Sequence, residues 1–315
     1  MTAKRFLKDR AVLLLFIVFI MIMVIFKPSF VTLTNIKNVL IDASIYGVSA
    51  LAMTIAIITG AFDLSLASNF AWAQIFFCYL LNLWGGNGFG ILAAFIVMVL
   101  SCMLLGSVNG VVIVKGKIPA FIATLGMSTI IKGSCLLFTS GDMISTSNAF
   151  VTMMGKGTFL GISYLTWIFA AIVVIAWYFM KYTTFGRALY ATGGNATAAK
   201  LSGINVGLCQ FSTFVILGMA AGISGSMFVC QMRAGSVLYG TDLSLTCVAC
   251  TVVGGTPLTG GKGSVLRTVL GTLLIYVLYK GLAFLGLQGY YNTMIRGVVL
   301  LAVVTFDAFM TRNSR

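Results

Sequence analysis

One glycine-rich stretch with a lysine, VVGGTPLTGGKGS at residues 252–264, could in principle hold a phosphate. A nucleotide-binding P-loop needs the pattern G-x-x-x-x-G-K-[ST], because its backbone amides surround the phosphates while the lysine and the hydroxyl contact them. Here Gly261 displaces Lys262 by one residue, and Gly263 occupies the place of the hydroxyl. We therefore predict that this loop does not bind ATP.

Residues for acid–base chemistry are too few for most enzymes. The chain has no Glu and no His, and all six of its acidic residues are Asp. A catalytic site needs a nucleophile with a base, a metal cluster or a pair of carboxylates. Cys247 and Cys250 form one C-x-x-C, without the second pair or the histidine of a metal site. The sequence predicts a protein that is not an enzyme and that needs no metal or cofactor.

Two acids stand among apolar and small residues, each at the start of an Asp-Leu-Ser-Leu sequence. Asp63 and Ser65 belong to the first copy, and Asp242 and Ser244 belong to the second. Either these residues end broken helices beside a polar path through the protein, or each Asp caps the helix that follows. Capping is the default interpretation. The repeated sequence is a weak sign of two related halves.

Three further charges fall within apolar runs, namely Lys132, Lys280 and Arg296. Each lies in the outer half of its predicted span, so its stem could extend to the lipid headgroups. The alternative is that these side chains face an outward-opening vestibule, where they would donate hydrogen bonds to a hydroxyl-rich solute or meet acids of a docked partner.

The composition predicts an integral membrane protein built from helices. Hydrophobic residues make up 60% of the 315 residues and charged residues only 8%, whereas soluble domains carry about 25% charged residues. Because a transmembrane helix needs roughly 20 apolar residues, the chain can supply about ten. The predicted spans are residues 11–26, 39–59, 64–84, 91–113, 119–139, 164–180, 206–230, 243–258, 265–285 and 290–306. The short eighth segment could be re-entrant.

The basic residues support a topology with both termini in the cytoplasm. With ten spans, thirteen Lys and Arg residues fall on the side of the N-terminus, and four fall on the other side: Lys27, Lys37, Lys156 and Arg233. Cytoplasmic loops retain basic residues. The net charge of +14 therefore reflects membrane topology, and its scattered distribution argues against nucleic acid as a partner.

The longest polar loop on the cytoplasmic side runs from Lys181 to Asn205. Gly193 and Gly194 are expected to break the chain there, and Asn195 can cap a new helix that ends before Gly203. This pattern predicts a short helix at the cytoplasmic face.

Five separated motifs resemble one family of membrane proteins. They are ITGAFDLSLAS, KGKIPAFIATLGM, FGRALYATGGNATAAKLSGINV, VVGGTPLTGGKGS and GYYNTMIRGVVLLAVV. In this order they resemble the permease subunit of bacterial ribose-type ABC importers, a group that also takes up other monosaccharides and autoinducer-2. The match extends from about residue 30 to residue 307.

The resemblance implies a single transmembrane permease domain over residues 1–315 in the bacterial inner membrane. It implies a separate ATPase subunit, a periplasmic or lipid-anchored sugar-binding protein, and a second permease copy, identical or paralogous. Residues 187–205 correspond to the coupling segment that contacts the ATPase. Within this segment, the resemblance assigns the coupling role to Gly194, Asn195, Ala198, Ser202 and Gly203.

The chain departs from relatives where they commonly read G-G-I-D-L-S-V-G, because here Ala61 and Phe62 precede Asp63 and Ala67 ends the motif. The solute therefore need not be ribose. Two rival functions stay open. An ion-coupled secondary transporter would need more intramembrane acids, and a membrane scaffold would leave the cytoplasmic helix unexplained.

Overall fold

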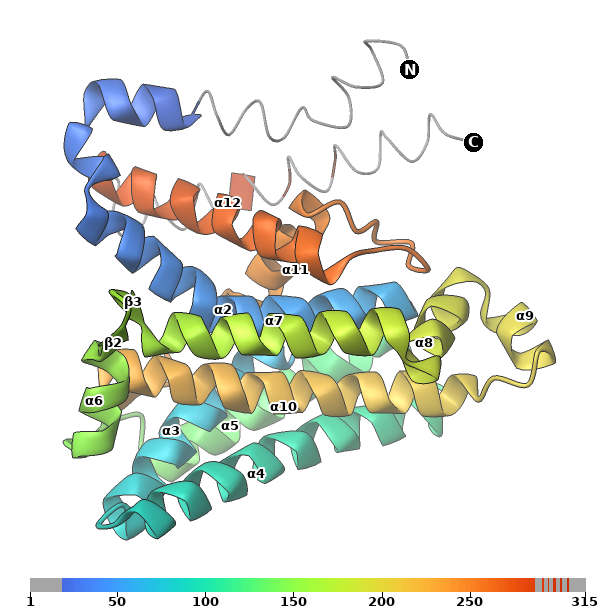
Figure 1. Ribbon diagram of the computed structural model, residues 1–315. Helices are drawn as coiled ribbons and strands as arrows, with labels where there is room; N and C mark the ends of the chain where they lie inside the picture. The colour runs from blue at the N-terminus through green and yellow to red at the C-terminus, as the bar shows by residue number, and fades with distance from the viewer. Residues whose placement is uncertain are drawn as a thin grey trace.

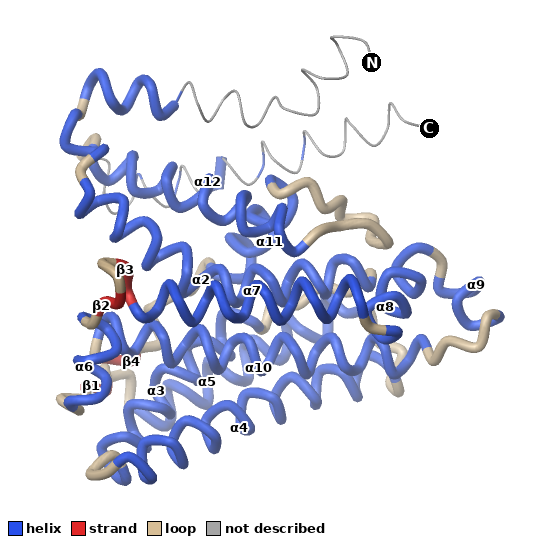
Figure 2. The backbone as a smooth tube through the Cα atoms, in the orientation of Figure 1, coloured by secondary structure: helices blue, strands red, loops and turns tan. Residues whose placement is uncertain are grey.

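The computed structural model describes residues 19–286 and positions 291, 294, 297, 298, 301 and 305. In the described part, helices lie side by side in a bundle, and short strands occur only in the connections (Figures 1 and 2). Residues 19–26 are helical. The elements that follow are η1 (Pro28–Val31), α2 (Leu33–Thr59), α3 (Leu66–Trp84), α4 (Gly88–Val114), α5 (Ala120–Thr139), β1 (Ile144–Ser145), α6 (Ala149–Lys156), β2 (Thr158–Phe159), β3 (Ile162–Ser163), α7 (Tyr164–Tyr182), α8 (Thr184–Gly194), α9 (Ala196–Leu201), α10 (Val206–Met232), β4 (Ala234–Gly235), α11 (Leu243–Val253) and α12 (Val265–Phe284).

Seven described helices are long and apolar enough to cross a membrane: α2, α3, α4, α5, α7, α10 and α12. They coincide with the second to seventh and the ninth predicted spans. The eighth prediction, 243–258, is corrected, because α11 has only 11 residues. At about 1.5 Å per residue it cannot cross an apolar layer about 30 Å thick. Most of the tenth predicted span and about half of the first lie outside the described residues.

The centre of the bundle consists of α2, α3 and α10, whereas α4, α5 and α7 leave most of their surface exposed. Hydroxyl pairs join α2 to α10 and to α12. The Oγ atoms of Ser49 and Ser224 lie 2.7 Å apart, and Thr54 Oγ1 lies 2.7 Å from Thr268 Oγ1. Such pairs satisfy polar side chains where water is absent.

Close backbone contact holds α4 against α10. A Cβ atom at Gly106 would lie 2.3 Å from the Phe214 carbonyl oxygen, and one at Gly218 would lie 2.3 Å from the Cys102 carbonyl oxygen. Small residues allow membrane helices to approach in this way.

The two ends of the bundle differ. One end carries α6 and two antiparallel pairs of strands, β1 with β4 and β2 with β3. At the other end, α8 lies beside α10, and α9 projects beyond the long helices (Figure 1). The polar loop predicted from Lys181 to Asn205 thus lies at the end opposite α6, and it has regular structure of its own.

Candidate functional site

The predicted coupling segment, residues 187–205, lies in the unit that α8 and α9 form at one end of the bundle. Each helix begins at a polar cap: Thr183 Oγ1 accepts a hydrogen bond from the Gly186 amide at 2.9 Å, and Asn195 Oδ1 accepts one from the Ala198 amide at 3.0 Å. The helix predicted to start at Asn195 is therefore present. The predicted break after Gly193 and Gly194 is also present, because α8 ends at Gly194 and the two glycines form its last turn.

The five positions carried over to the coupling segment have distinct local roles. Gly194 ends α8, Asn195 caps α9, and Ala198 is exposed on α9. Ser202 Oγ donates to the Ala198 carbonyl at 3.0 Å, and Gly203 turns the chain with φ +84°. Beside them, Leu201 is 86% exposed.

The glycine-rich loop of residues 255–263 packs against the end of α8 and the end of α2. We call these backbone contacts the seat of the coupling segment. The Gly261 amide donates to the Ile58 carbonyl at 2.9 Å. A Cβ atom at Gly261 would lie 2.6 Å from Gly194 Cα, and one at Gly193 would lie 1.7 Å from the Ile58 carbonyl oxygen. The absence of side chains therefore lets α8, the end of α2 and this loop meet backbone to backbone, which explains the glycines without a phosphate.

A side-chain hydrogen bond strengthens this seat. Tyr190 Oη donates to the Gly263 carbonyl at 3.0 Å. Burial raises the pKa of Tyr190 above its ordinary value of 10.0, so the phenol stays protonated as a donor. Lys262 of the same loop is exposed. The sequence did not predict that Gly193 meets Gly261 or that Tyr190 bonds to this loop, although paired glycines in two distant segments were a visible signal.

Deeper in the bundle, the first Asp-Leu-Ser-Leu sequence forms a buried polar turn. Asp63 Oδ1 accepts hydrogen bonds from the Ser65 amide and the Ser65 hydroxyl, both at 2.7 Å. Asn109 Nδ2 of α4 donates to Ser65 Oγ at 2.7 Å. Burial raises the pKa of Asp63 from 3.8 to about 6, although the hydrogen bonds from Ser65 oppose the rise. Asp63 thus orders the start of α3.

The second Asp-Leu-Ser-Leu sequence contacts the first. Ser244 Oγ donates to the Leu64 carbonyl at 2.9 Å and accepts from the Ala67 amide at 3.0 Å. Asp242 occupies the cap position of α11 but accepts no capping hydrogen bond there. The two copies therefore form one junction, which joins the starts of α3 and α11 although 180 residues separate Leu64 from Ser244.

The three charges predicted within spans have different surroundings. Lys280 of α12 pairs with Asp42 of α2 at 2.9 Å. The prediction that only Asp63 and Asp242 are embedded among apolar residues is incomplete, because Asp42 also lies among apolar neighbours on α2. Lys132 is exposed on α5, and Arg296 lies outside the described residues.

Comparison with known proteins identifies the family. Residues 35–304 match the family of branched-chain amino acid transport system / permease components. The chain belongs to this permease family. Ribose import permease protein RbsC of Escherichia coli (strain K12) is 33% identical over 312 residues, which cover 96% of this chain and 95% of the relative.

Other relatives extend the match to a second sugar. The permease is 34% identical over 292 residues to ribose import permease protein RbsC of Bacillus subtilis (strain 168), covering 92% of this chain and 89% of the relative. It is 30% identical over 304 residues to L-arabinose ABC transporter permease protein AraH of Azospirillum brasilense, covering 96% and 88%. No solved structure matches the chain. The chain is a multi-pass membrane permease and not an enzyme.

Proposed function

We propose that this permease is the membrane subunit of a bacterial ABC importer that carries a monosaccharide across the inner membrane by alternating access. Its relatives are named ribose and L-arabinose permeases. A single transmembrane domain over residues 1–315 would pair with a second permease copy. A binding protein would deliver the solute outside, and an ATPase subunit would supply the energy inside.

The observation that carries this proposal is the capped, projecting coupling segment with its backbone seat. Helix α9 is joined to α8, and the glycines at the end of α8 contact Ile58 and Gly261. A displacement of α9 would therefore be transmitted to these residues. The loop of residues 255–263 then leads directly into α12 and follows directly from α11. Movement of an ATPase beneath α9 would therefore displace helices on both sides of the buried junction, as alternating access requires.

Residues at the buried junction are candidates for the border of the solute path: Asp63, Ser65, Asp242 and Ser244. They lie at the starts of α3, which contacts α4 and α10, and of α11, which contacts α2 and α12. Lys132 and Arg296 stay candidates for an outer vestibule. Lys280 is less suited to bind a solute, because its ammonium group is already paired with Asp42.

The coupling segment is tested by Ala198→Glu. Ala198 is exposed on α9, so the change leaves the fold intact, but it adds a charge that must be desolvated against an ATPase, at a cost of about 2 kcal/mol or more. We expect normal membrane levels, weakened retention of the ATPase and loss of solute-stimulated ATP hydrolysis. Thr158→Glu, an exposed position at the opposite end, is the matched control. Normal transport by Ala198→Glu would disprove the coupling role.

One observation favours the rival function, an ion-coupled transporter. The buried Asp63 has a pKa raised to about 6, which suits a proton site. Reconstitution separates the two functions: an ABC permease transports only with ATP, its ATPase and its binding protein, whereas a proton-coupled carrier transports the sugar alone when a pH gradient is applied.

A further inference from the structure

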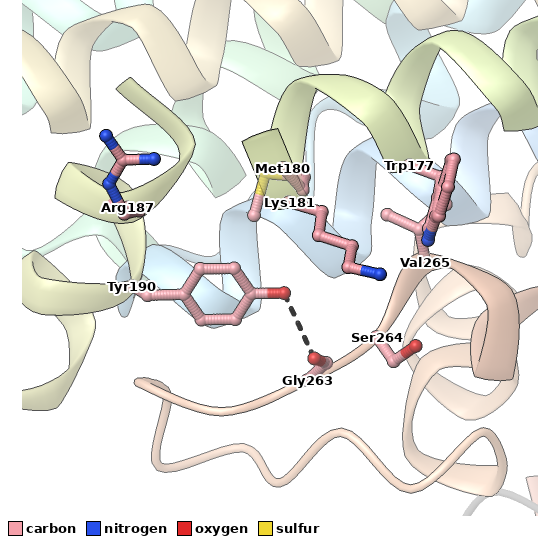
Figure 3. A pocket seen from close by; sticks show the side chains of 8 residues that line it. All are labelled: Trp177, Met180, Lys181, Arg187, Tyr190, Gly263, Ser264 and Val265. Atoms are coloured by element: carbon pink, nitrogen blue, oxygen red, sulfur yellow. Dashed lines mark hydrogen bonds between the residues drawn. The ribbon is translucent and has the colours of Figure 1, made fainter. Parts of the chain in front are cut away.

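A pocket of about 310 Å³ lies between the end of α7, helix α8 and the start of α12, outside the junction described above. Figure 3 shows its lining side chains. They are Trp177, Met180 and Lys181 of α7, Arg187 and Tyr190 of α8, and Gly263, Ser264 and Val265 at the start of α12.

The pocket is positively charged and lacks a counterion among the described residues. Its ionisable lining residues are Lys181, Arg187 and Tyr190, and no carboxylate belongs to the lining. The ammonium group of Lys181 lies 5.1 Å from the centre of the Trp177 ring and 5.0 Å from that of Tyr182. The guanidinium of Arg187 points away from Gly263 (Figure 3) and donates only a long hydrogen bond, 3.5 Å, to the Tyr182 carbonyl.

The start of α12 adds hydrogen-bond donors. The first amides of a helix lack partners within the helix and favour an anion. At α12 the cap residue is Ser264, whose side chain makes no capping hydrogen bond. The Lys181 ammonium group extends toward the Trp177 and Ser264 side of the pocket (Figure 3). Ammonium, hydroxyl and helix amides together suit a phosphate group.

The position of the pocket along α7 indicates where this phosphate comes from. The apolar side chains of Val174 and Ile175 are 61% and 67% exposed, and the next turn presents Tyr178 and Tyr182, 60% and 50% exposed. Apolar residues followed by aromatic residues and a lysine mark the boundary between acyl chains and headgroups. The pocket therefore lies at headgroup level, beside a surface for an acyl chain.

We propose that this pocket binds the phosphate group of an anionic phospholipid. The lipid would belong to the cytoplasmic leaflet in the proposed topology, on which this placement rests. Because Tyr190 and Gly263 belong both to the pocket and to the seat of the coupling segment, the bound headgroup would brace α7, α8 and α12 against each other. The lipid would thus act as a structural ligand of the coupling end.

The test is a thermal-unfolding titration of the purified full chain in detergent. The probes are short-chain phosphatidylglycerol, phosphatidylcholine with the same acyl chains, and inorganic phosphate. We expect phosphatidylglycerol to raise the unfolding midpoint most. Lys181→Gln should weaken its apparent affinity about fivefold, as one basic contact predicts, and Lys181→Arg should restore it. Lys115→Gln, which removes an exposed lysine outside the pocket, is the matched control.

Three results would overturn the proposal. Equal stabilisation by phosphatidylcholine would show that the headgroup charge is not recognised, and an equal loss in Lys115→Gln would show that the effect is only net charge. If inorganic phosphate alone raised the midpoint as far as the lipid did, the ligand would be a soluble anion. Should Lys181→Gln fail to fold, Arg187→Gln at the rim replaces it under the same criteria. A failure of sugar transport would leave these readouts unaffected.

Discussion

At the scale of single residues, Asp63 and Asp42 each have a polar or charged partner inside the permease. Asp63 is buried with its serine partner, and Asp42 and Lys280 form an ion pair between α2 and α12. Charges inside a membrane protein are costly unless they are paired or neutralised. Each of these two acids therefore gives a measurable signature when its charge is removed.

Asp63→Asn is expected to remove a pH dependence of stability. The folded-state pKa of Asp63, about 6, is above its ordinary 3.8, so the native state holds the proton more tightly than the unfolded state. This contribution is fully present below pH 3.8 and is lost as the pH rises through 6. The unfolding free energy of the native chain should decrease by about 2–3 kcal/mol between pH 4 and pH 7, and the unfolding midpoint should decrease with it. Asp63→Asn, which mimics the protonated acid, should lack this fall.

Thermal unfolding in detergent at several pH values measures this difference. Ser65→Ala is the control, because it removes a hydrogen bond to Asp63 but keeps the carboxyl group. If the native chain and Asp63→Asn show parallel profiles, the buried carboxyl is not the titrating group.

Lys280→Met is expected to destabilise the permease by about 1–2 kcal/mol, because it leaves the Asp42 carboxylate without its partner. Adding Asp42→Asn should recover most of the loss, since the double variant contains no unpaired charge. The four unfolding midpoints form a double-mutant cycle. Additive effects would mean that the pair does not interact. Lys132→Met, at an exposed lysine on α5, should have little effect.

At the scale of elements, the coupling segment is held mainly by backbone contacts, to which Tyr190 adds one side-chain hydrogen bond. Helix α8 ends against the carbonyl groups of α2 and against the loop that connects α11 to α12. Contacts of this kind tolerate no added atoms, because a tightly packed backbone cannot move aside without shifting a helix.

Gly193→Ala should therefore damage the permease, whereas Gly194→Ala should not. A Cβ atom at Gly193 would lie 1.7 Å from the Ile58 carbonyl oxygen, but one at Gly194 would lie 4.0 Å from its nearest neighbour, Gly261 Cα. We expect Gly193→Ala to lower the unfolding free energy by about 2 kcal/mol or more and to impair solute-stimulated ATP hydrolysis. The neighbouring variant serves as its matched control. Equal effects of the two would contradict the backbone seat.

At the scale of the whole molecule, the proposed topology places the coupling segment inside and the α6 end outside. Lys200 is exposed on α9, and Ser147 is exposed just before α6. Ser147 is a better probe than the neighbouring Asn148, whose side chain caps α6 and contacts Gly85. All seven native cysteines are buried, so their replacement provides a clean background.

In that background, Ser147→Cys should react with a membrane-impermeant thiol reagent in intact cells, and Lys200→Cys should react only after the cells are opened. The basic residues of cytoplasmic loops are the physical reason. The extent of labelling of each variant is measured on a denaturing gel, before and after the cells are opened. Labelling of position 200 from outside intact cells would disprove the topology with cytoplasmic termini.

Much of the fold could be read from the sequence, because hydropathy and capping are local. The seven long spans, the start of α9 at Asn195 and the permease family all follow from residues that are close together in the chain. The length of α11 did not follow. Hydropathy does not mark where a helix ends: residues 254–258 carry no charge and were counted into the span, although Gly254 and Gly255 follow the last turn of the helix.

The tertiary structure alone decided which distant residues meet. It paired Asp42 with Lys280, 238 residues apart, placed Ser244 on the start of α3, and set Gly193 against residues of α2 and the glycine-rich loop. The sequence determined that these side chains are small or polar inside apolar helices. Their partners depend on how helices pack, and packing is settled by the shapes of all the neighbours together, which no local pattern contains.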